Sequence, residues 1–184
     1  MRYIIYDLEA TCWRGRPPKG ITEVIEIGAI MVDRYGDVNS RFSKFVKPVV
    51  NPHLSGFCKK LTSISQENVN GAQTFDRVVS DFKEWGEMFD DEYILLSWGA
   101  DDKKLLANDC KLHKLDHEFT EQFVDLKKAY RNLKGLKNAS GLKSTVKKEG
   151  FDFTGLHHRA ISDAENLAKI FIKYLEDWDL YYPK

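Results

Sequence analysis

Apolar residues gather in short runs near the N-terminus, and these runs predict strands. Arg2 to Tyr6 is apolar and aromatic, Glu23 to Val32 forms a second apolar run, and Arg41 to Val46 alternates as a third. A turn from Asp33 to Asp37, which contains Gly36, joins the second and third runs. The first 46 residues therefore predict three strands linked by a hairpin.

Later segments alternate between predicted helices and strands. Thr74 to Phe89 and the stripe from Ala164 to Leu175 place apolar residues at i, i+3 and i+4, the pattern of amphipathic helices. Tyr93 to Ser97 predicts a buried strand, and Phe123 to Leu126 predicts a short one. This order predicts an α/β chain with a mixed five-stranded sheet flanked by helices. Further helices are predicted for Thr62 to Asn70, Asp101 to His113 and Gly141 to Glu149.

Composition adds a few constraints on the number of domains, the partners and the cellular compartment. The 184 residues, 42% of them hydrophobic, predict a single domain over residues 1–184. Basic and acidic residues number 28 each, so net charge selects no partner. Cys12, Cys58 and Cys110 are too far apart for a CxxC site, and their odd number argues against a disulfide framework. The cysteine pattern therefore favours a cytoplasmic protein. We expect neither a signal peptide nor a membrane segment, because Asp7 comes early and the apolar runs are short.

Four acidic residues lie where a buried element meets its exposed end. Asp7 and Glu9 follow the first strand at i and i+2, so they point to the same side. Asp101 follows the strand from Tyr93 to Ser97, and Asp163 lies in the first turn of the last helix. Carboxylates are rarely buried unless they are paired or bound to a cation. Together these positions predict a cation site.

Oxygen ligands favour Mg²⁺ or Mn²⁺ over zinc. Four carboxylates offset the charge of two divalent ions roughly 4 Å apart, as in two-metal phosphodiester hydrolysis. Each acid also has a simpler explanation: Asp7 as a turn cap, Glu9 as the partner of a surface lysine, and Asp163 as a favourable charge at a helix start. The combined pattern favours the metal site.

These residues resemble a known family. DLEATC at Asp7 to Cys12, Asp101 after a strand, and His158 five residues before Asp163 are similar to the three motifs of the DEDDh 3′–5′ exonucleases, which have the ribonuclease H-like fold. The related DEDDy subtype places a tyrosine where this chain has Arg159. DLEATC also resembles the histone-mRNA and RNA-interference 3′ exonuclease branch.

The segment from Leu54 to Phe75 resembles the same branch. That branch usually has an aromatic residue directly before the acid of the second motif, whereas here Ala100 stands there. Asp102 follows Asp101, which leaves two candidates for this acid. We prefer Asp101, because Leu105 then falls at the expected distance.

The resemblance implies an enzyme that hydrolyses phosphodiester bonds from the 3′ end of single-stranded nucleic acid and releases nucleoside 5′-monophosphates. It implies two Mg²⁺ ions, replaceable by Mn²⁺, and His158 as the general base, whose reference pKa of about 6.5 suits this role. His157 is interpreted as a surface histidine. The implied metal ligands are Asp7, Glu9, Asp101 and Asp163, with Glu9 also taking part in catalysis. The residues expected to contact substrate are Leu8, Ala10, Thr11, Trp13, Phe57, Leu61 and Thr62.

Some interpretations stay open. Trp13 and Phe57 are equally compatible with base stacking and with a place in the core. Eight basic and no acidic residues between Lys127 and Lys148 are typical either of a phosphate-binding surface or of a solvated helix face. RNA is favoured over DNA by the branch resemblance alone, so a DNA-trimming exonuclease is the first alternative. A nucleic-acid-binding module without catalysis is the second. A haloacid dehalogenase needs DxD where Glu9 stands, and zinc-protease, P-loop and dinucleotide motifs are missing.

Overall fold

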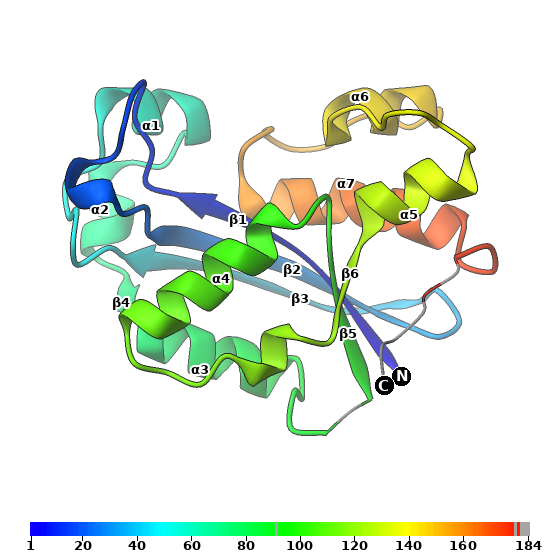
Figure 1. Cartoon of the computed structure of the whole chain (residues 1–184), viewed down its shortest axis with the longest axis horizontal. Coiled ribbons are helices and arrows are strands. Elements are labelled where there is room, and N and C mark those ends of the chain that lie inside the picture. Colours follow the sequence, from blue (N-terminus) through cyan, green and yellow to red (C-terminus); the bar gives the residue numbers. More distant parts are fainter. Residues whose placement is uncertain (91, 179, 181–184) are drawn as a thin grey trace.

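A mixed sheet with strand order β4-β3-β2-β1-β5-β6 lies at the centre of the computed structural model, which describes residues 1–90, 92–178 and 180 (Figure 1). Neighbouring strands are antiparallel among β1, β2 and β3, whereas β5 is parallel to β1, β6 to β5 and β4 to β3. The predicted hairpin and mixed α/β sheet are thereby confirmed. The strands are β1 (Arg2–Ala10), β2 (Val24–Asp33), β3 (Val38–Lys47), β4 (Gln73–Thr74), β5 (Tyr93–Ser97) and β6 (Phe123–Asp125).

Two predictions about elements were wrong. The sheet has six strands instead of five, because β4 adds two residues that are too few to produce a periodic pattern. The single helix expected for Thr62 to Asn70 is two helices, α1 (Gly56–Thr62) and α2 (Gln66–Asn70). Ser63 ends α1 in the left-handed region, with φ 59°, and Ser65 caps α2 through a reciprocal hydrogen-bond pair with Asn68.

Strand β1 is longer than the sequence predicted. It pairs with β2 from Arg2 opposite Asp33 through to Ala10 opposite Val24. Asp7 and Glu9 therefore belong to the strand itself instead of following it. Their backbone is held by the antiparallel ladder, which makes their side-chain directions a property of the sheet.

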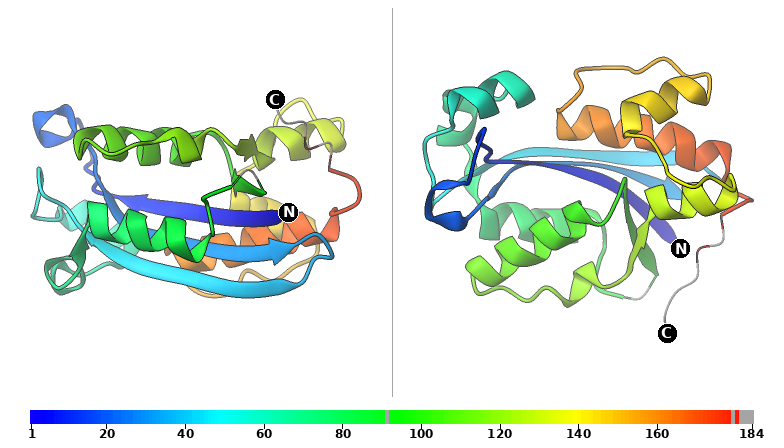
Figure 2. Two further views of the ribbon diagram at one scale, coloured as in Figure 1. Left: turned by 90° about the horizontal axis from the view of Figure 1, so that it is seen from below. Right: turned by 45° about the horizontal axis from the view of Figure 1, so that its top comes forward.

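The helices cover both faces of the curved sheet, as two further views show (Figure 2). Alternate residues of β1 point to opposite faces: Tyr6 packs near Phe82 of α3, while the neighbouring core contains Ile5 together with Phe171 of α7. None of the described helices combines the length and apolar character needed to cross a membrane. The helices besides α1 and α2 are α3 (Phe75–Trp85), α4 (Asp101–Leu112), α5 (Leu126–Leu133), α6 (Leu142–Lys148) and α7 (Ala160–Lys173), with short 3₁₀ turns at Pro18–Gly20 and Glu118–Thr120.

The segment that carries α1 is fastened to the sheet by a buried carboxylate. Glu23, which is 1% exposed, accepts hydrogen bonds from the backbone nitrogens of Val49, Val50 and Asn51 at 2.6–2.8 Å. These bonds satisfy three backbone donors in the loop after β3. Helix α1 stands on one side of the end of β1, and α6 stands on the other (Figure 1).

Candidate active site

Asp7 and Glu9 lie on the face of β1 that is covered by α7. In the neighbouring strand they stand opposite Gly28 and Glu26, both of which contact the start of α7. Because side chains alternate across a strand, residues two apart share this face. The first strand thus presents two carboxylates to the beginning of α7.

Gly28 allows α7 to make backbone contact with the sheet. A Cβ atom at this position would lie 2.1 Å from the backbone nitrogen of Ile161, so only glycine fits. The close approach places Asp163, in the first turn of α7, beside the acids of β1. One carboxylate oxygen from each of Asp7, Glu9 and Asp163 lies within 4.8 Å of the others. The structure therefore brings together three of the four predicted acids.

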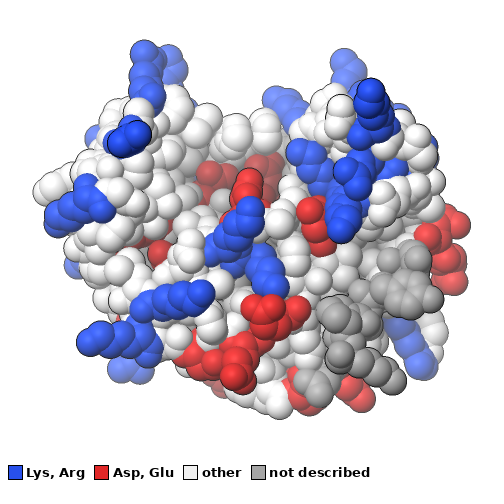
Figure 3. Space-filling model, viewed as in Figure 1, with Lys and Arg blue, Asp and Glu red and all other residues white. Residues whose placement is uncertain are grey.

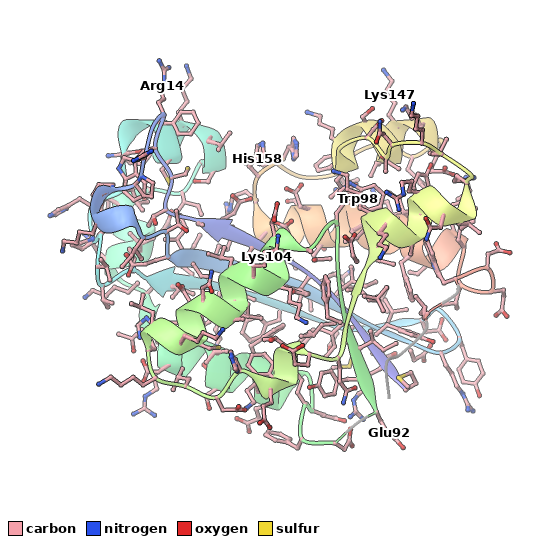
Figure 4. All side chains as sticks on the ribbon, in the orientation of Figure 1. Arg14, Glu92, Trp98, Lys104, Lys147 and His158 are labelled. Carbon is pink, nitrogen blue, oxygen red and sulfur yellow. The ribbon has the colours of Figure 1, made fainter. Side chains whose placement is uncertain are left out.

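The fourth predicted acid, Asp101, points away from this group. Its side chain is 98% exposed and forms an ion pair with Lys104 on the outer surface of α4 (Figure 4). Asp102 instead is turned inward and accepts a hydrogen bond from the backbone nitrogen of Leu8 at 3.2 Å. The preference for Asp101 is thus corrected to Asp102. The physical reason is the helix phase: the residue that packs into the core is Leu106, four residues after Asp102.

The acids strongly perturb one another. Burial raises the pKa of Asp7 well above its usual value, and the charges of Asp102 and Asp163 raise it further. Burial, with the neighbouring charges of Asp163 and Glu26, raises the pKa of Glu9 to about 8, and burial raises that of Asp102 to about 6. Carboxylates crowded in this way favour protonation or a bound cation. When these acids are ionised, the site carries an excess of negative charge, which favours the binding of a cation.

The chemistry of the donors matches a hard divalent cation. The group formed by Asp7, Glu9 and Asp163 offers only oxygen ligands, and Asp102 lies near enough to raise the pKa of Asp7. In the space-filling view, acidic atoms lie on the floor of a hollow between the parts that carry α1 and α6, and both rims carry Lys or Arg (Figure 3). The site can thus hold a divalent metal ion and remains open to a charged ligand.

His158 lies at the entrance to this hollow. Its backbone nitrogen donates to Asp163 at 3.1 Å, and the side chain points between α1 and α6 (Figure 4). Burial, followed by the charge of His157, lowers the pKa of His158. A lowered pKa keeps the imidazole neutral near pH 7, which is the form that accepts a proton. The position and charge state both suit a general base.

His157 is not the free surface residue that the sequence suggested. Its Nδ1 lies 3.1 and 3.3 Å from the two carboxylate oxygens of Asp163. Its ring stacks on that of His158, with centroids 4.0 Å apart. The interpretation as a surface histidine is therefore wrong, because the turn before α7 brings both rings to the same carboxylate.

A buried ion pair next to the acids was missed by the sequence reasoning. Arg159 donates to both oxygens of Glu26 at 2.8–3.2 Å, and the backbone nitrogen of Ala160 donates to Glu26 at 3.0 Å. Glu26 is 1% exposed. The pair ties the start of α7 to β2 one strand away from Glu9. The available signal was a glutamate in the middle of the apolar run EVIEIGAIMV.

Three of the residues expected to contact substrate have buried side chains. Leu8 packs in the core against α3 and α4. The Thr11 hydroxyl accepts from the backbone nitrogen of Glu23, and the Thr62 hydroxyl donates to the carbonyl of Cys58. Thr11 and Thr62 have no exposed surface. We therefore no longer expect these three side chains to contact a nucleotide.

The other expected contacts remain accessible. Trp13, Phe57 and Leu61 are partly or largely exposed, and Ala10 ends β1 beside them. Hydrogen bonds from Ser55 to the carbonyl of Cys12 and from Cys58 to that of Ala10 fasten α1 to the end of β1 and the residues after it. These four positions stay predictions for the wall of the hollow on the α1 side.

Comparisons with known proteins identify relatives over nearly the whole chain. A family model described as Exonuclease (RNase_T) matches residues 4–171. The 3′-5′ exoribonuclease 1 of Homo sapiens is 32% identical over 181 residues, which cover 94% of this chain and 52% of that protein. The probable 3′-5′ exonuclease KapD of Bacillus subtilis (strain 168) is 29% identical over 184 residues, covering 98% and 87%.

The chain spans about half the length of the curated relatives it matches first. Among solved structures, the nuclease domain of 3′hExo, a DEDDh family member bound to rAMP, superposes with a TM-score of 0.87 and 31% identity, covering 96% of this chain and 92% of that one. The resemblance to the DEDDh exonucleases and the ribonuclease H-like fold is thereby confirmed. With a family match over residues 4–171, the chain belongs to the RNase_T exonuclease family.

Proposed function

We propose that this chain is a metal-dependent 3′–5′ exonuclease that shortens single-stranded RNA and releases nucleoside 5′-monophosphates. The observation that carries the proposal is the convergence of Asp7, Glu9 and Asp163, with Asp102 close by and His158 at the entrance. These residues come from β1, α4, the turn before α7 and the first turn of α7, so only the folded chain brings them together.

The acids Asp7, Glu9, Asp102 and Asp163 are the residues that would hold two Mg²⁺ ions, or Mn²⁺ in their place. The chemistry that such ions supply when bound is activation of a water molecule and neutralisation of charge on the leaving oxygen. Glu9, which is 7% exposed and lies beside Asp7 and Asp163, is proposed to take part in catalysis through the metal that it helps to hold.

His158 supplies the proton acceptor. Its neutral imidazole takes the proton of the attacking water and releases it to solvent, because the side chain faces the open hollow (Figure 4). Asp163 fixes the His158 backbone by accepting its N–H. The base is therefore held by the same side chain that contributes to the acidic group.

The wall on the α1 side is proposed to receive the terminal nucleotide. Phe57 and Trp13 offer exposed aromatic surface for stacking, which is largely independent of sequence. Leu61 and Ala10 would bound the same space.

RNA is proposed over DNA because relatives are named exoribonucleases and the similar nuclease domain is bound to rAMP. A DNA-trimming exonuclease on the same site is the second candidate. A binding module without catalysis is disfavoured, because Asp7, Glu9 and Asp163 lie close together and the His158 backbone contacts Asp163. We also propose a cytoplasmic location, since Cys12, Cys58 and Cys110 are free thiols.

The test is digestion of 5′-labelled single-stranded RNA and of matched DNA with millimolar Mg²⁺. A ladder shortened one nucleotide at a time, faster on RNA and lost in Asp7→Asn, supports the proposal. Internal fragments would indicate an endonuclease. Binding without cleavage by the metal-loaded wild-type protein would contradict it.

A further inference from the structure

Four cations on α5 and α6 form two like-charge pairs. Lys127 and Arg131 on α5 are four residues apart, as are Lys143 and Lys147 on α6, so each pair lies on one side of its helix. Like charges at this spacing destabilise a helix. Within the described part of the chain, none of the four forms an ion pair with a carboxylate. A solvated helix face usually interleaves charges of both signs, so solvation alone does not explain this arrangement.

Contacts on the inner side of α5 and α6 fix both helices. Glu149, directly after α6, accepts hydrogen bonds from the Tyr130 hydroxyl of α5 at 2.5 Å and from Lys173 of α7 at 2.8 Å. The indole of Trp98, directly after β5, donates to the carbonyl of Ser140 at 3.1 Å and packs against Tyr130 with ring centroids 5.5 Å apart (Figure 4). The cations therefore project from helices whose positions are set by the sheet and α7.

The basic surface reaches the active-site hollow at Lys143. The Lys143 ammonium lies 5.8 Å from the centre of the Phe153 ring, which packs against the His157 ring with centroids 5.3 Å apart. Burial is the main cause of the lowered pKa of His158, and the charges of His157 and then of Lys143 add to it. Lys143 is thus near enough to act on His158 electrostatically. In the space-filling view, Lys and Arg atoms gather beside the hollow, over α5 and α6 (Figure 3).

The cations of α5 border a pocket in the protein surface. This pocket, of about 270 Å³, is lined by Asp125, Lys127, Lys128, Arg131, Asn138 and Ala139. Its one carboxylate, Asp125, caps α5 by accepting the backbone N–H of Lys128 at 2.9 Å. A concave surface with three cations suits a phosphate group, whose oxygens accept charge-assisted hydrogen bonds.

We propose that five of these cations bind the phosphates of the substrate strand on the 5′ side of the cut. The α5–α6 surface consists of Lys127, Lys128, Arg131, Lys143 and Lys147. The direction of the strand rests on the proposed function, in which the scissile phosphate lies at the acids and His158 and the terminal nucleotide lies against α1. The remainder of the strand then leaves past His158 toward Lys143. Contacts with phosphate are independent of base sequence.

Binding tests the surface without cleavage. The full chain is titrated into 5′-labelled single-stranded RNA in EDTA over a range of salt concentrations, and fluorescence anisotropy gives Kd. One double variant, Lys127→Gln with Arg131→Gln, changes α5, and the other, Lys143→Gln with Lys147→Gln, changes α6. The control is Lys111→Gln with Lys114→Gln, which removes two exposed cations at the end of α4, outside the α5–α6 surface.

Each double variant should weaken binding about tenfold, equally for oligo(A) and oligo(U). The slope of log Kd against log salt should fall by about 1.4, since each phosphate contact on a single strand contributes about 0.7. The control should bind like wild type, and Lys143→Arg with Lys147→Arg, which keeps the charge, should keep the affinity. Melting temperatures of the two double variants should not fall, because like-charge repulsion is removed. Wild-type affinity and slope in both would overturn the proposal.

Digestion with Mg²⁺ separates the α5–α6 surface from the proposed function. On a long single-stranded RNA, the α5 double variant should show a KM about tenfold higher at unchanged kcat. A dinucleotide extends only one nucleotide beyond the cut, so the variant should digest it like wild type; an equal KM increase on both substrates would overturn the upstream position. If the wild-type protein binds RNA through these cations but cuts none, the proposed function fails and the surface stands. If it cuts RNA and both double variants match the control, the surface fails and the proposed function stands.

Discussion

Gly28 and Ile161 are in backbone contact, and this contact sets the depth at which α7 lies on the sheet. A Cβ atom on Gly28 would stand 2.1 Å from the Ile161 nitrogen and 2.2 Å from the carbonyl carbon of Ala160. Both neighbours are backbone atoms, so a side-chain rotation cannot make room. The distance between the acids of β1 and Asp163 thus depends on the absence of one methyl group.

Gly28→Ala should move the start of α7 away from β2. We expect a loss of about 3 kcal/mol in the free energy of unfolding, because overpacking against backbone cannot relax locally. The variant should also lose Mg²⁺-dependent activity. Chemical denaturation and the RNA digest measure the two effects. Gly56→Ala is the control: its Cβ meets nothing within 4 Å, and its stability should change by less than about 1 kcal/mol.

Asp102→Asn and Asp101→Asn should differ sharply. Asp102 faces Asp7 and the backbone of Leu8, so its neutralisation should slow turnover about a hundredfold or more. The Asp101 side chain is exposed and pairs with Lys104 at the surface, so its variant should retain activity and change stability by less than about 0.5 kcal/mol. Steady-state rates of both purified variants decide the matter, and equal losses would contradict the assignment of Asp102.

Stability without metal should fall as pH rises. The pKa of Glu9 is about 8 in the folded protein against an ordinary value of 4.5, so its protonated form favours folding. This contribution is complete below pH 4.5 and is lost as pH rises toward 8. In EDTA, the free energy of unfolding should therefore decline between these values, less steeply in Glu9→Gln. A wild-type and variant curve of equal slope would count against the crowded carboxylate.

Mg²⁺ or Mn²⁺ at millimolar concentration should raise the melting temperature, because the ions bind the folded acids and not the unfolded chain. The increase should be larger at pH 8 than at pH 5, since the acids are then ionised. Asp7→Asn should lose most of the shift. Differential scanning fluorimetry with and without EDTA gives the measurement, and an unchanged shift in the variant would remove Asp7 from the metal site.

His158→Ala should slow turnover about a hundredfold while keeping the Mg²⁺-induced rise in melting temperature. Because the pKa of His158 is lowered by burial, the acid limb of the wild-type kcat profile should lie below pH 6.5. That limb should disappear in the variant. If the limb survives, another group accepts the proton.

Local patterns predicted those parts of the fold that consist of long periodic segments. The runs of β2 and β5 are buried on both faces and are almost continuously apolar, and the stripe of α7 recurs with the period of a helix, so local sequence reveals them. Strand β4 has two residues and depends on pairing with β3, which no local pattern encodes. The same holds for the division between α1 and α2, where the conformation of Ser63 is a single-residue event.

Among the site residues too, local patterns predicted some positions, whereas others depend on tertiary contacts. Asp7 and Glu9 were found because the period of a strand is fixed at two residues. Asp101 was preferred over Asp102 because one residue on a helix corresponds to a rotation of about 100°, and the phase depends on which leucine enters the core. His157, Glu26 and Arg159 matter through contacts across the sheet or across a turn. Such contacts exist only once α7 has packed.

The order in which the acids occur along the chain has a consequence for biosynthesis. Asp7 lies in the first strand, whereas Asp163 lies in the last helix that the structure describes. During translation, the emerging polypeptide therefore has only part of the acidic group until α7 has left the ribosome and docked on β2. A polypeptide that ends before Asp163 therefore lacks one of the three acids that the fold brings together.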